Sequence, residues 1–281
     1  MTANDLDKLK LQLDLLPSMP AVRAELLRCL TQDDPDLPTV ARLVMGDQVI
    51  AAKVLRVANS SFFGLSTQVE SVTQAVTLLG FSGLQSVALA SVVMDTFQPH
   101  PQTAWFAHNT YWRHSMATAT CAQMLAGRLR MNESTAFTAG LLHDMGRLVM
   151  LVCYPGPYRS VCDWSQTHDV PMMDAEMHVL GFDHCHAGGV LAQAWHLPPV
   201  IAQSMALHHR THDPEAGAMA KLVHVADALA HALDLDPAPN NAVPTVQSSA
   251  WEALNMDWDH ASDLFAAIEK RYRQTCDSLL G

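Results

Sequence analysis

Histidine and aspartate dominate the side chains of this sequence that could do chemistry. Fifteen of its 281 residues are histidine, and a His-Asp dipeptide starts at His143, His168 and His212. The second and third dipeptides lie just before prolines, so we expect them in loops or at helix starts. The first, His143-Asp144, lies in a strongly apolar run, where an ionised carboxylate lowers stability unless it is paired or binds a cation.

A neutral imidazole nitrogen and a carboxylate oxygen are both good ligands for divalent transition metals. Further candidate ligands lie in separate, largely apolar segments of the chain: His114, His184, His208, His209 and Asp227. Taken singly, a histidine on an apolar helix is more often a hydrogen-bonded core residue than a ligand, and His208-His209 could equally end a helix. Two aspartates in apolar helices together with four histidines favour a metal site, and a shared aspartate could bridge two ions.

The elements that must position these side chains are helices. Apolar residues recur at helical spacing along most of the chain, and no segment alternates between apolar and polar residues as a half-buried strand does. We therefore predict an all-α protein. Prolines, glycines and polar clusters divide it into predicted helices over residues 6–16, 21–30, 37–45, 49–57, 69–79, 82–96, 105–130, 133–151, 158–167, 172–180, 184–194, 200–207, 214–233, 251–256 and 261–280.

The helix predicted over residues 133–151 has the pair His143-Asp144 in its middle. Gly140 and Gly146 flank the pair. Because glycine inside a helix costs about 1 kcal/mol relative to alanine, we expect each to permit close helix packing or close approach of a metal and its ligands.

A boundary between two domains is predicted at residues 98–102, where two prolines occur in five residues. On this basis we expect a helical N-terminal subdomain over residues 1–98. A multi-helix core would then follow over residues 104–281.

Charge and composition exclude several classes of protein. With 17 basic and 28 acidic residues the net charge is −11, which argues against nucleic acid or an anionic membrane surface as the partner. No apolar stretch reaches the roughly 20 residues of a membrane span. The six cysteines form no C-x-x-C pair, so we expect reduced thiols, an inert buried Cys185, and a cytoplasmic location.

The order His114, His143-Asp144, Asp227 resembles the signature of the HD superfamily, which comprises all-helical metal-dependent phosphohydrolases and their inactive relatives. Within it the chain is most similar to the HDOD (HD-related output domain) branch. The similarity rests on residues 16–20, 53–60, 74–80, 137–144, 176–184 and 195–198. The resemblance implies an N-terminal helical subdomain packed on an HD-type core, and a role in bacterial signalling or regulation.

The candidate ligands also resemble those of the HD-GYP cyclic-di-GMP phosphodiesterases. That resemblance implies a metal-ligand set of His114, His143, Asp144, His184, His208, His209 and Asp227. Three positions depart from the HD-GYP pattern: Arg210 replaces a glutamate, Arg147 replaces a lysine, and Thr110 stands where some members have a further carboxylate. The chain also has no Gly-Tyr-Pro motif after His209. These departures argue against hydrolysis of cyclic-di-GMP but leave metal binding expected.

Two functions are compatible with this pattern. The first is a signalling protein that acts by binding a partner of its pathway, or a small anionic ligand such as a nucleotide, and has a metal site in its core. The alternative is a metal-dependent phosphohydrolase acting on a nucleotide or cyclic dinucleotide, with Asp144 and Arg147 as catalytic residues. We expect one or two divalent ions; the resemblance favours Fe or Mn, and the ligand types also suit Zn or Ni.

Overall fold

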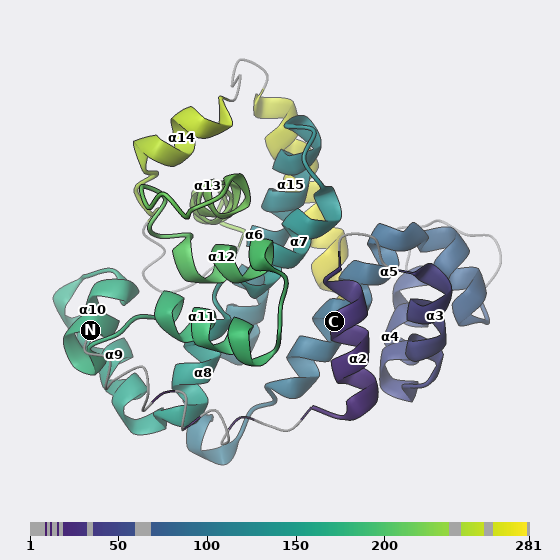
Figure 1. Ribbon diagram of the computed structural model, residues 1–281, viewed down its shortest axis with the longest axis horizontal. Coiled ribbons are helices and arrows are strands. Elements are labelled where there is room, and N and C mark those ends of the chain that lie inside the picture. Colours follow the sequence, from purple (N-terminus) through teal and green to yellow (C-terminus); the bar gives the residue numbers. More distant parts are fainter. Residues whose placement is uncertain are drawn as a thin grey trace.

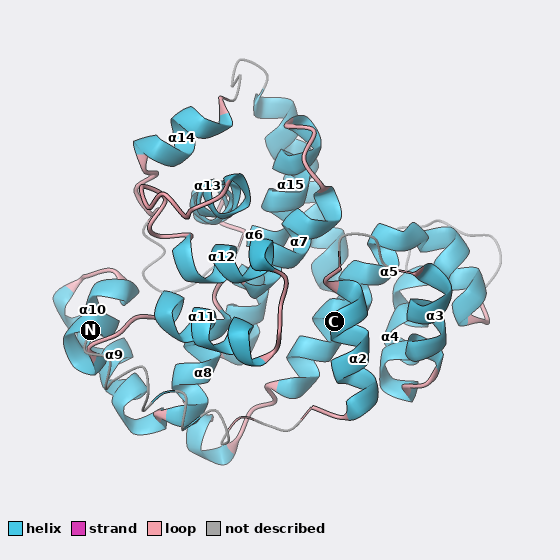
Figure 2. Ribbon diagram, in the orientation of Figure 1, coloured by secondary structure: helices cyan, strands magenta, loops and turns pink. Residues whose placement is uncertain are grey.

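The computed structural model describes residues 9, 12, 16, 19–32, 36–59, 69–235, 243–255 and 261–279. All regular elements in these ranges are helices, which confirms the all-α prediction (Figure 2). The helix predicted over residues 6–16 falls almost entirely outside the described residues.

The N-terminal part of the chain forms a group of four helices that stands to one side of the molecule (Figure 1). These helices are α2 (Ala21–Leu30), α3 (Leu37–Met45), α4 (Gln48–Ala58) and α5 (Val72–Thr96). They pack on one another mainly through α5, which contacts α2, α3 and α4.

The remaining helices build the larger part of the molecule, with α6 and α7 at its centre (Figure 1). After the short 3-10 helix η2 (Pro101–Thr103) they are α6 (His108–Arg128), α7 (Glu133–Leu142), α8 (Met145–Cys153), α9 (Pro155–His168), α10 (Met172–Leu180), α11 (His184–Ala194), α12 (Pro199–Leu207), α13 (Ala218–Ala232), α14 (Ser248–Leu254) and α15 (Ala261–Leu279). The closest pairings are α6 with α7, α6 with α13, α8 with α11, and α11 with α12. These pairings bring the HD-type segments into one core.

Several helices begin at a side chain that caps their free amide groups. The carboxylates of Asp36 and Asp47 accept hydrogen bonds from backbone amides at the starts of α3 and α4. Asn132 does the same for α7, and Asp183 for α11. Because an N-cap of this kind contributes about 1 kcal/mol, these residues set where the four helices begin.

Gly80 bends α5, close to the break that the sequence predicts. Its φ of 66° and ψ of −179° lie in a region that other residues rarely adopt, so the chain turns there without a side-chain penalty. The first part of α5 starts at Val72 rather than at residue 69, because Ser71 is the N-cap and accepts a hydrogen bond from Gln74 N. The non-helical backbone at Gly80 therefore separates two helical segments, which confirms the predicted break, although both segments carry the label α5.

The chain breaks at His143-Asp144, which corrects the prediction of a single helix over residues 133–151. Helix α7 ends at Leu142 and α8 begins at Met145, with Asp144 at φ −97° and ψ 7°. His143 Nδ1 lies 2.7 Å from Gly140 O, the carbonyl that the amide of Asp144 would use in a continuous helix. This competition from a side chain favours the break. Asp144 is thus placed at a helix junction and not within a helix.

Two glycines on either side of the break allow helices to approach closely. A Cβ atom on Gly140 would lie 2.7 Å from the Cα of Ala119 in α6. A Cβ atom on Gly146 would overlap the carbonyl oxygen of His184 at the start of α11. The expectation of close packing is therefore confirmed at both positions, and neither site has room for a side chain.

The two groups of helices share an apolar core. Helix α5 packs on α7, and α15 contacts both α4 and α5. Buried apolar residues form one cluster that runs from Leu26 in α2 to Cys276 in α15. The N-terminal group therefore rests on the core, while the division of the chain into domains 1–98 and 104–281 stays a prediction.

The expectation that no apolar stretch reaches the length of a membrane span is corrected, because two stretches are long and apolar enough to cross a membrane by length and composition alone. They are residues Val72–Thr96 and Glu133–Cys153, whose most apolar windows are 50% and 89% buried inside the structure. Packing against other helices accounts for the apolar character of the second stretch without a membrane. Such stretches also occur as core helices, so they are weak grounds for a membrane protein.

Candidate metal centre

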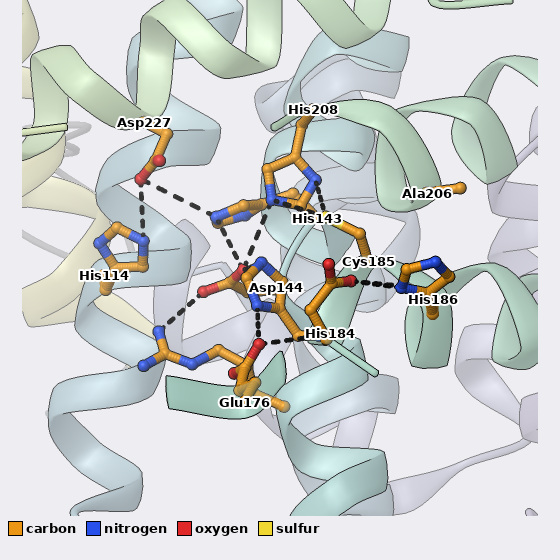
Figure 3. A network of polar contacts seen from close by, with 12 residues as sticks. His114, His143, Asp144, Glu176, His184, Cys185, His186, Ala206, His208 and Asp227 are labelled. Carbon is orange, nitrogen blue, oxygen red and sulfur yellow. Dashed lines mark hydrogen bonds and ion pairs between the residues drawn. The ribbon is translucent and has the colours of Figure 1, made fainter. Parts of the chain in front are cut away.

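The seven predicted metal ligands meet in one place. They come from α6, the junction of α7 and α8, α11, the end of α12, and α13, as Figure 3 shows for most of them. All are buried except His209, which is partly exposed. The ligand atoms form overlapping groups of His and Asp that could hold a metal ion, and these groups contain His114, His143, Asp144, His184, His208, His209, Asp227 and, in addition, His231.

One carboxylate oxygen, Oδ1 of Asp144, lies at the centre of the first group. The Nε2 atoms of three imidazoles surround it, at 3.3 Å for His184, 3.6 Å for His143 and 3.7 Å for His208. Ligand atoms about 2.0–2.2 Å from one ion lie at most about 4.4 Å from each other. Each of the three Nε2 atoms is therefore close enough to Asp144 Oδ1 to share an ion with it, and the ligand atoms of Asp144, His184, His208 and His209 all lie within 4.8 Å of one another.

In each of the three imidazoles the other nitrogen, Nδ1, is hydrogen-bonded to an oxygen atom. Nδ1 of His143 lies 2.7 Å from Gly140 O, and Nδ1 of His208 lies 3.0 Å from Ser204 O. A carbonyl oxygen can only accept a hydrogen bond, so in the neutral rings the proton is on Nδ1. The lone pair is then on Nε2, which faces Asp144, as in a metal-ligating histidine.

The third imidazole, His184, is held by a carboxylate. Its Nδ1 lies 2.6 Å from Oε2 of Glu176, which also accepts a hydrogen bond of 2.9 Å from the His184 amide. On the opposite side of the ring, Nε2 is buried and has no hydrogen-bond partner among the described residues. A buried polar atom in this state is destabilising unless a ligand satisfies it. A divalent ion between Nε2 and Asp144 would do so, and the residues present fit such an ion.

A second carboxylate oxygen, Oδ1 of Asp227, faces a group of its own. His114 Nε2 lies 3.2 Å from it, His231 Nε2 3.6 Å, and His143 Nε2 4.0 Å. His143 therefore stands between the two aspartates. The sequence analysis missed His231, although a signal was present: it follows Asp227 by four residues, the spacing that puts two side chains on one face of a helix.

Comparison with known proteins agrees with this arrangement. The model of the HDOD domain matches residues 16–211, which is most of the chain. The chain belongs to the HDOD family. The resemblance found in the sequence is thereby confirmed.

This HDOD protein is 27% identical over 212 residues to an uncharacterized protein of Treponema pallidum (strain Nichols). The match covers 73% of the present chain and 40% of the Treponema protein. The HDOD chain thus spans less than half of that relative.

Solved structures resemble the HDOD chain over almost its whole length. A candidate phosphohydrolase from Shewanella amazonensis SB2B is 25% identical with a TM-score of 0.77, and the match covers 99% of this chain and 98% of that one. An HDOD domain protein of unknown function from Geobacter sulfurreducens is 24% identical with a TM-score of 0.73, covering 91% and 93% of the two chains. At that identity the Geobacter structure supports the fold alone.

The buried negative charge of the candidate metal centre favours the binding of a cation there. Asp144, Asp227 and Glu176 are all buried. Burial opposes the ionisation of Asp144, yet His143, His184 and Arg147 hold its pKa well below the usual value. Burial also lowers the pKa of His143 to about 4, so this ring is neutral and able to act as a ligand at pH 7. The buried carboxylates need positive charge nearby, which either protons on the other histidines or a metal ion can supply.

Arg147 contacts Asp144 directly and is partly exposed. Its Nη1 lies 2.9 Å from Oδ2 of Asp144, its Nε lies 3.3 Å from the Tyr158 hydroxyl, and 24% of its side chain is exposed. Its catalytic role stays a prediction. Arg210, another departure from the HD-GYP pattern, instead pairs with Asp183, the N-cap of α11.

The cysteines take no part in the candidate ligand groups. All six are free thiols, as expected, and Cys185 is buried. Its Sγ lies 3.8 Å from Nδ1 and 3.9 Å from Nε2 of His208, so it contacts the ring of a candidate ligand. Glu176, in contrast, has a role that the sequence analysis did not assign, since it orients His184; its signal was an acidic residue in the partly apolar helix α10.

Proposed function

We propose that this HDOD protein is a divalent-metal-dependent phosphohydrolase acting on a small anionic phosphate ester of the nucleotide class. The observation that carries the proposal is the set of three imidazole Nε2 atoms, with their Nδ1 atoms already hydrogen-bonded, that surround Oδ1 of Asp144. Without a cation, Nε2 of His184 would stay buried with no hydrogen-bond partner among the described residues, which destabilises the core.

A divalent ion held by Asp144, His184, His208 and His209 would lower the pKa of a bound water from 15.7 to about 7 and so supply a nucleophile. Asp144 and Tyr158 would orient the Arg147 guanidinium toward the substrate. Asp144 fixes Arg147 through the contact between Oδ2 and Nη1, which leaves other guanidinium N–H groups to bind phosphate oxygens. Tyr158 holds Nε of Arg147 from the other side, so the guanidinium is aimed before a substrate arrives.

The likeness to the candidate phosphohydrolase from Shewanella supports the reaction class. The net charge of −11 and the partly exposed Arg147 support the proposed substrate class. A chain with this charge disfavours a long polyanion, whereas a small phosphate ester can bind next to one guanidinium and a metal centre.

The test is metal content together with turnover. Protein purified without chelator should contain one to two Fe, Mn or Zn ions per chain by inductively coupled plasma mass spectrometry, and it should hydrolyse bis-p-nitrophenyl phosphate. Asp144→Ala should lose both properties. Asp163→Ala, an exposed aspartate of α9, is the matched control and should keep both. A wild-type protein with under about 0.1 ion per chain after metal is added back would contradict the proposal.

A regulatory role through a protein partner is the second candidate, and one observation favours it. The described N-terminal helices contribute none of the candidate ligands, yet Val22, Met45 and Val49 on α2, α3 and α4 are 40%, 53% and 48% exposed. A Cβ atom on Gly46 would lie 3.9 Å from Cγ1 of Val22, so the end of α3 lies against Val22. A metal-loaded protein that turns over no phosphate ester would favour this role over hydrolysis.

A further inference from the structure

The group around Asp227 contains one histidine that the HD-type ligand pattern does not include. His231 lies four residues after Asp227 on α13, so both side chains are on one face of that helix. Its Nε2 lies 3.6 Å from Asp227 Oδ1 and joins His114 and Asp227 in a group of ligand atoms within 4.8 Å of one another. Its side chain is 19% exposed, more than those of His114 or Asp227.

The arrangement around Asp227 repeats that around Asp144. In each group, one Oδ1 atom faces three imidazole Nε2 atoms, and His143 belongs to both. The distances from Asp227 to His231 and to His143 are too long for hydrogen bonds. His114 Nε2, at 3.2 Å, is close enough to hydrogen-bond with Asp227 Oδ1, and the three ring nitrogens converge on this one carboxylate oxygen as the ligands of a cation would.

We propose that His231 is a metal ligand and that, with His114 and Asp227, it completes a second ion site next to the one at Asp144. The inference rests on the metal centre of the proposed function.

A purely structural role for His231 makes a different prediction. Its ring lies 4.7 Å from the ring of His114, centroid to centroid, at an interplanar angle of 35°. If the ring only packed against His114, any aromatic side chain would serve. If its nitrogen binds an ion, phenylalanine would fail and a carboxylate would serve without a ring.

The experiment is a calorimetric titration of metal-free protein with Mn²⁺, with bound ions counted by mass spectrometry. We expect two ions per chain for the wild type, one for His231→Phe, and two for His231→Asp. His212→Phe, at an exposed histidine, is the control and should bind two. Thermal unfolding of the metal-free variants by circular dichroism shows whether each is folded, and His231→Asp tests the ligand role should the phenylalanine variant not fold.

The possible outcomes distinguish the ligand role of His231 from the metal centre of the proposed function. Two ions in His231→Phe with dissociation constants within about threefold of the wild type would overturn the role of His231 but leave the metal centre. One ion in both the wild type and His231→Phe would also overturn it, since no second site would exist. No ion in the wild type would overturn both the second site and the proposed function. A rise of at least about tenfold in the second dissociation constant of His231→Phe alone is the supporting result.

Discussion

At the scale of single residues, the orientation of three ligand rings is set by the group that contacts the Nδ1 atom of each ring. Gly140 O, Ser204 O and Glu176 occupy the Nδ1 atoms of His143, His208 and His184. Each ring is thereby fixed in orientation and in tautomer, which lowers the entropy that ordering a ligand would otherwise cost. Two of these partners are backbone carbonyls one helical turn before their histidine, so the helix backbone itself orients the ligand ring.

Metal affinity should rise with pH. Burial opposes protonation of His208, but Cys185 and Asp144 raise its pKa to about 10. In the metal-free protein His208 is therefore an imidazolium at pH 7, and an ion binds only as that proton leaves. Below the pKa, each proton released on binding raises the affinity about tenfold per pH unit.

The measurement is the dissociation constant for Mn²⁺ at about pH 6.5, 7.5 and 8.5, with proton release counted in buffers of different ionisation enthalpy. We expect at least about a tenfold gain in affinity between the first two conditions. An affinity that is constant across this range would show that His208 is already neutral in the metal-free protein. Titrations at matched ionic strength control for screening of the charged centre.

The candidate ligands could be predicted from the sequence because each is a polar residue in an apolar context. His114, Asp144 and Asp227 all stand out in this way, and the structure brings them together. His231 was missed because its segment also carries Asp227, which already explained a polar residue there. Glu176 was missed because its role is to bind another side chain, and no spacing within the sequence shows which histidine it will meet.

At the scale of elements, helix boundaries could be predicted where a local signal sets them. The bounds of α2, α3, α10 and α11 agree with the predicted helices, since prolines, Asp36, Gly181 and Asp183 mark their ends. The break between α7 and α8 was not predicted. Its cause is a side-chain contact, His143 Nδ1 to Gly140 O, inside a run that is apolar and helix-favouring throughout.

Helix α8 should tolerate no side chain at Gly146. A Cβ atom there would overlap His184 O and lie 2.6 Å from Gly188 N, and both are backbone atoms of α11 that cannot rotate away. We expect Gly146→Ala to lower the free energy of unfolding by about 2 kcal/mol or more, in the range of overpacked cores. It should also weaken metal binding, because α11 carries His184.

The matched control for Gly146 is Gly156→Ala, in the first turn of α9. No atom lies within 4 Å of its Cβ position, so alanine should be neutral or stabilising by up to about 1 kcal/mol. Urea unfolding of both metal-free variants gives the comparison. Equal stability of the two variants would mean that α8 and α11 can separate at little cost, contrary to the close packing described here.

At the scale of the whole molecule, the centre joins segments that are far apart in the chain. Its candidate ligands span residues 114 to 231 and come from α6, α8, α11, α12 and α13 or their ends. Among the described residues, the N-terminal group of helices, α9, α10, α14 and α15 contribute none of them. An ion at the centre would thus act as a cross-link within the HD-type core, and it can do so only when that core is folded.

Metal should therefore stabilise the folded protein as a whole. An ion present at about 100 times its dissociation constant adds about 2.7 kcal/mol if it binds the folded state alone. For a chain of this size, we expect a rise in Tm of roughly 5–10 °C on adding Mn²⁺ to metal-free protein, since each kcal/mol is worth about 2–4 °C. Differential scanning calorimetry measures this rise in Tm.

Asp144→Ala should show no such rise, whereas Asp163→Ala should match the wild type. An equal rise in Asp144→Ala would place the stabilising ion somewhere other than the centre, because the carboxylate that three imidazoles surround would then not be needed to hold it.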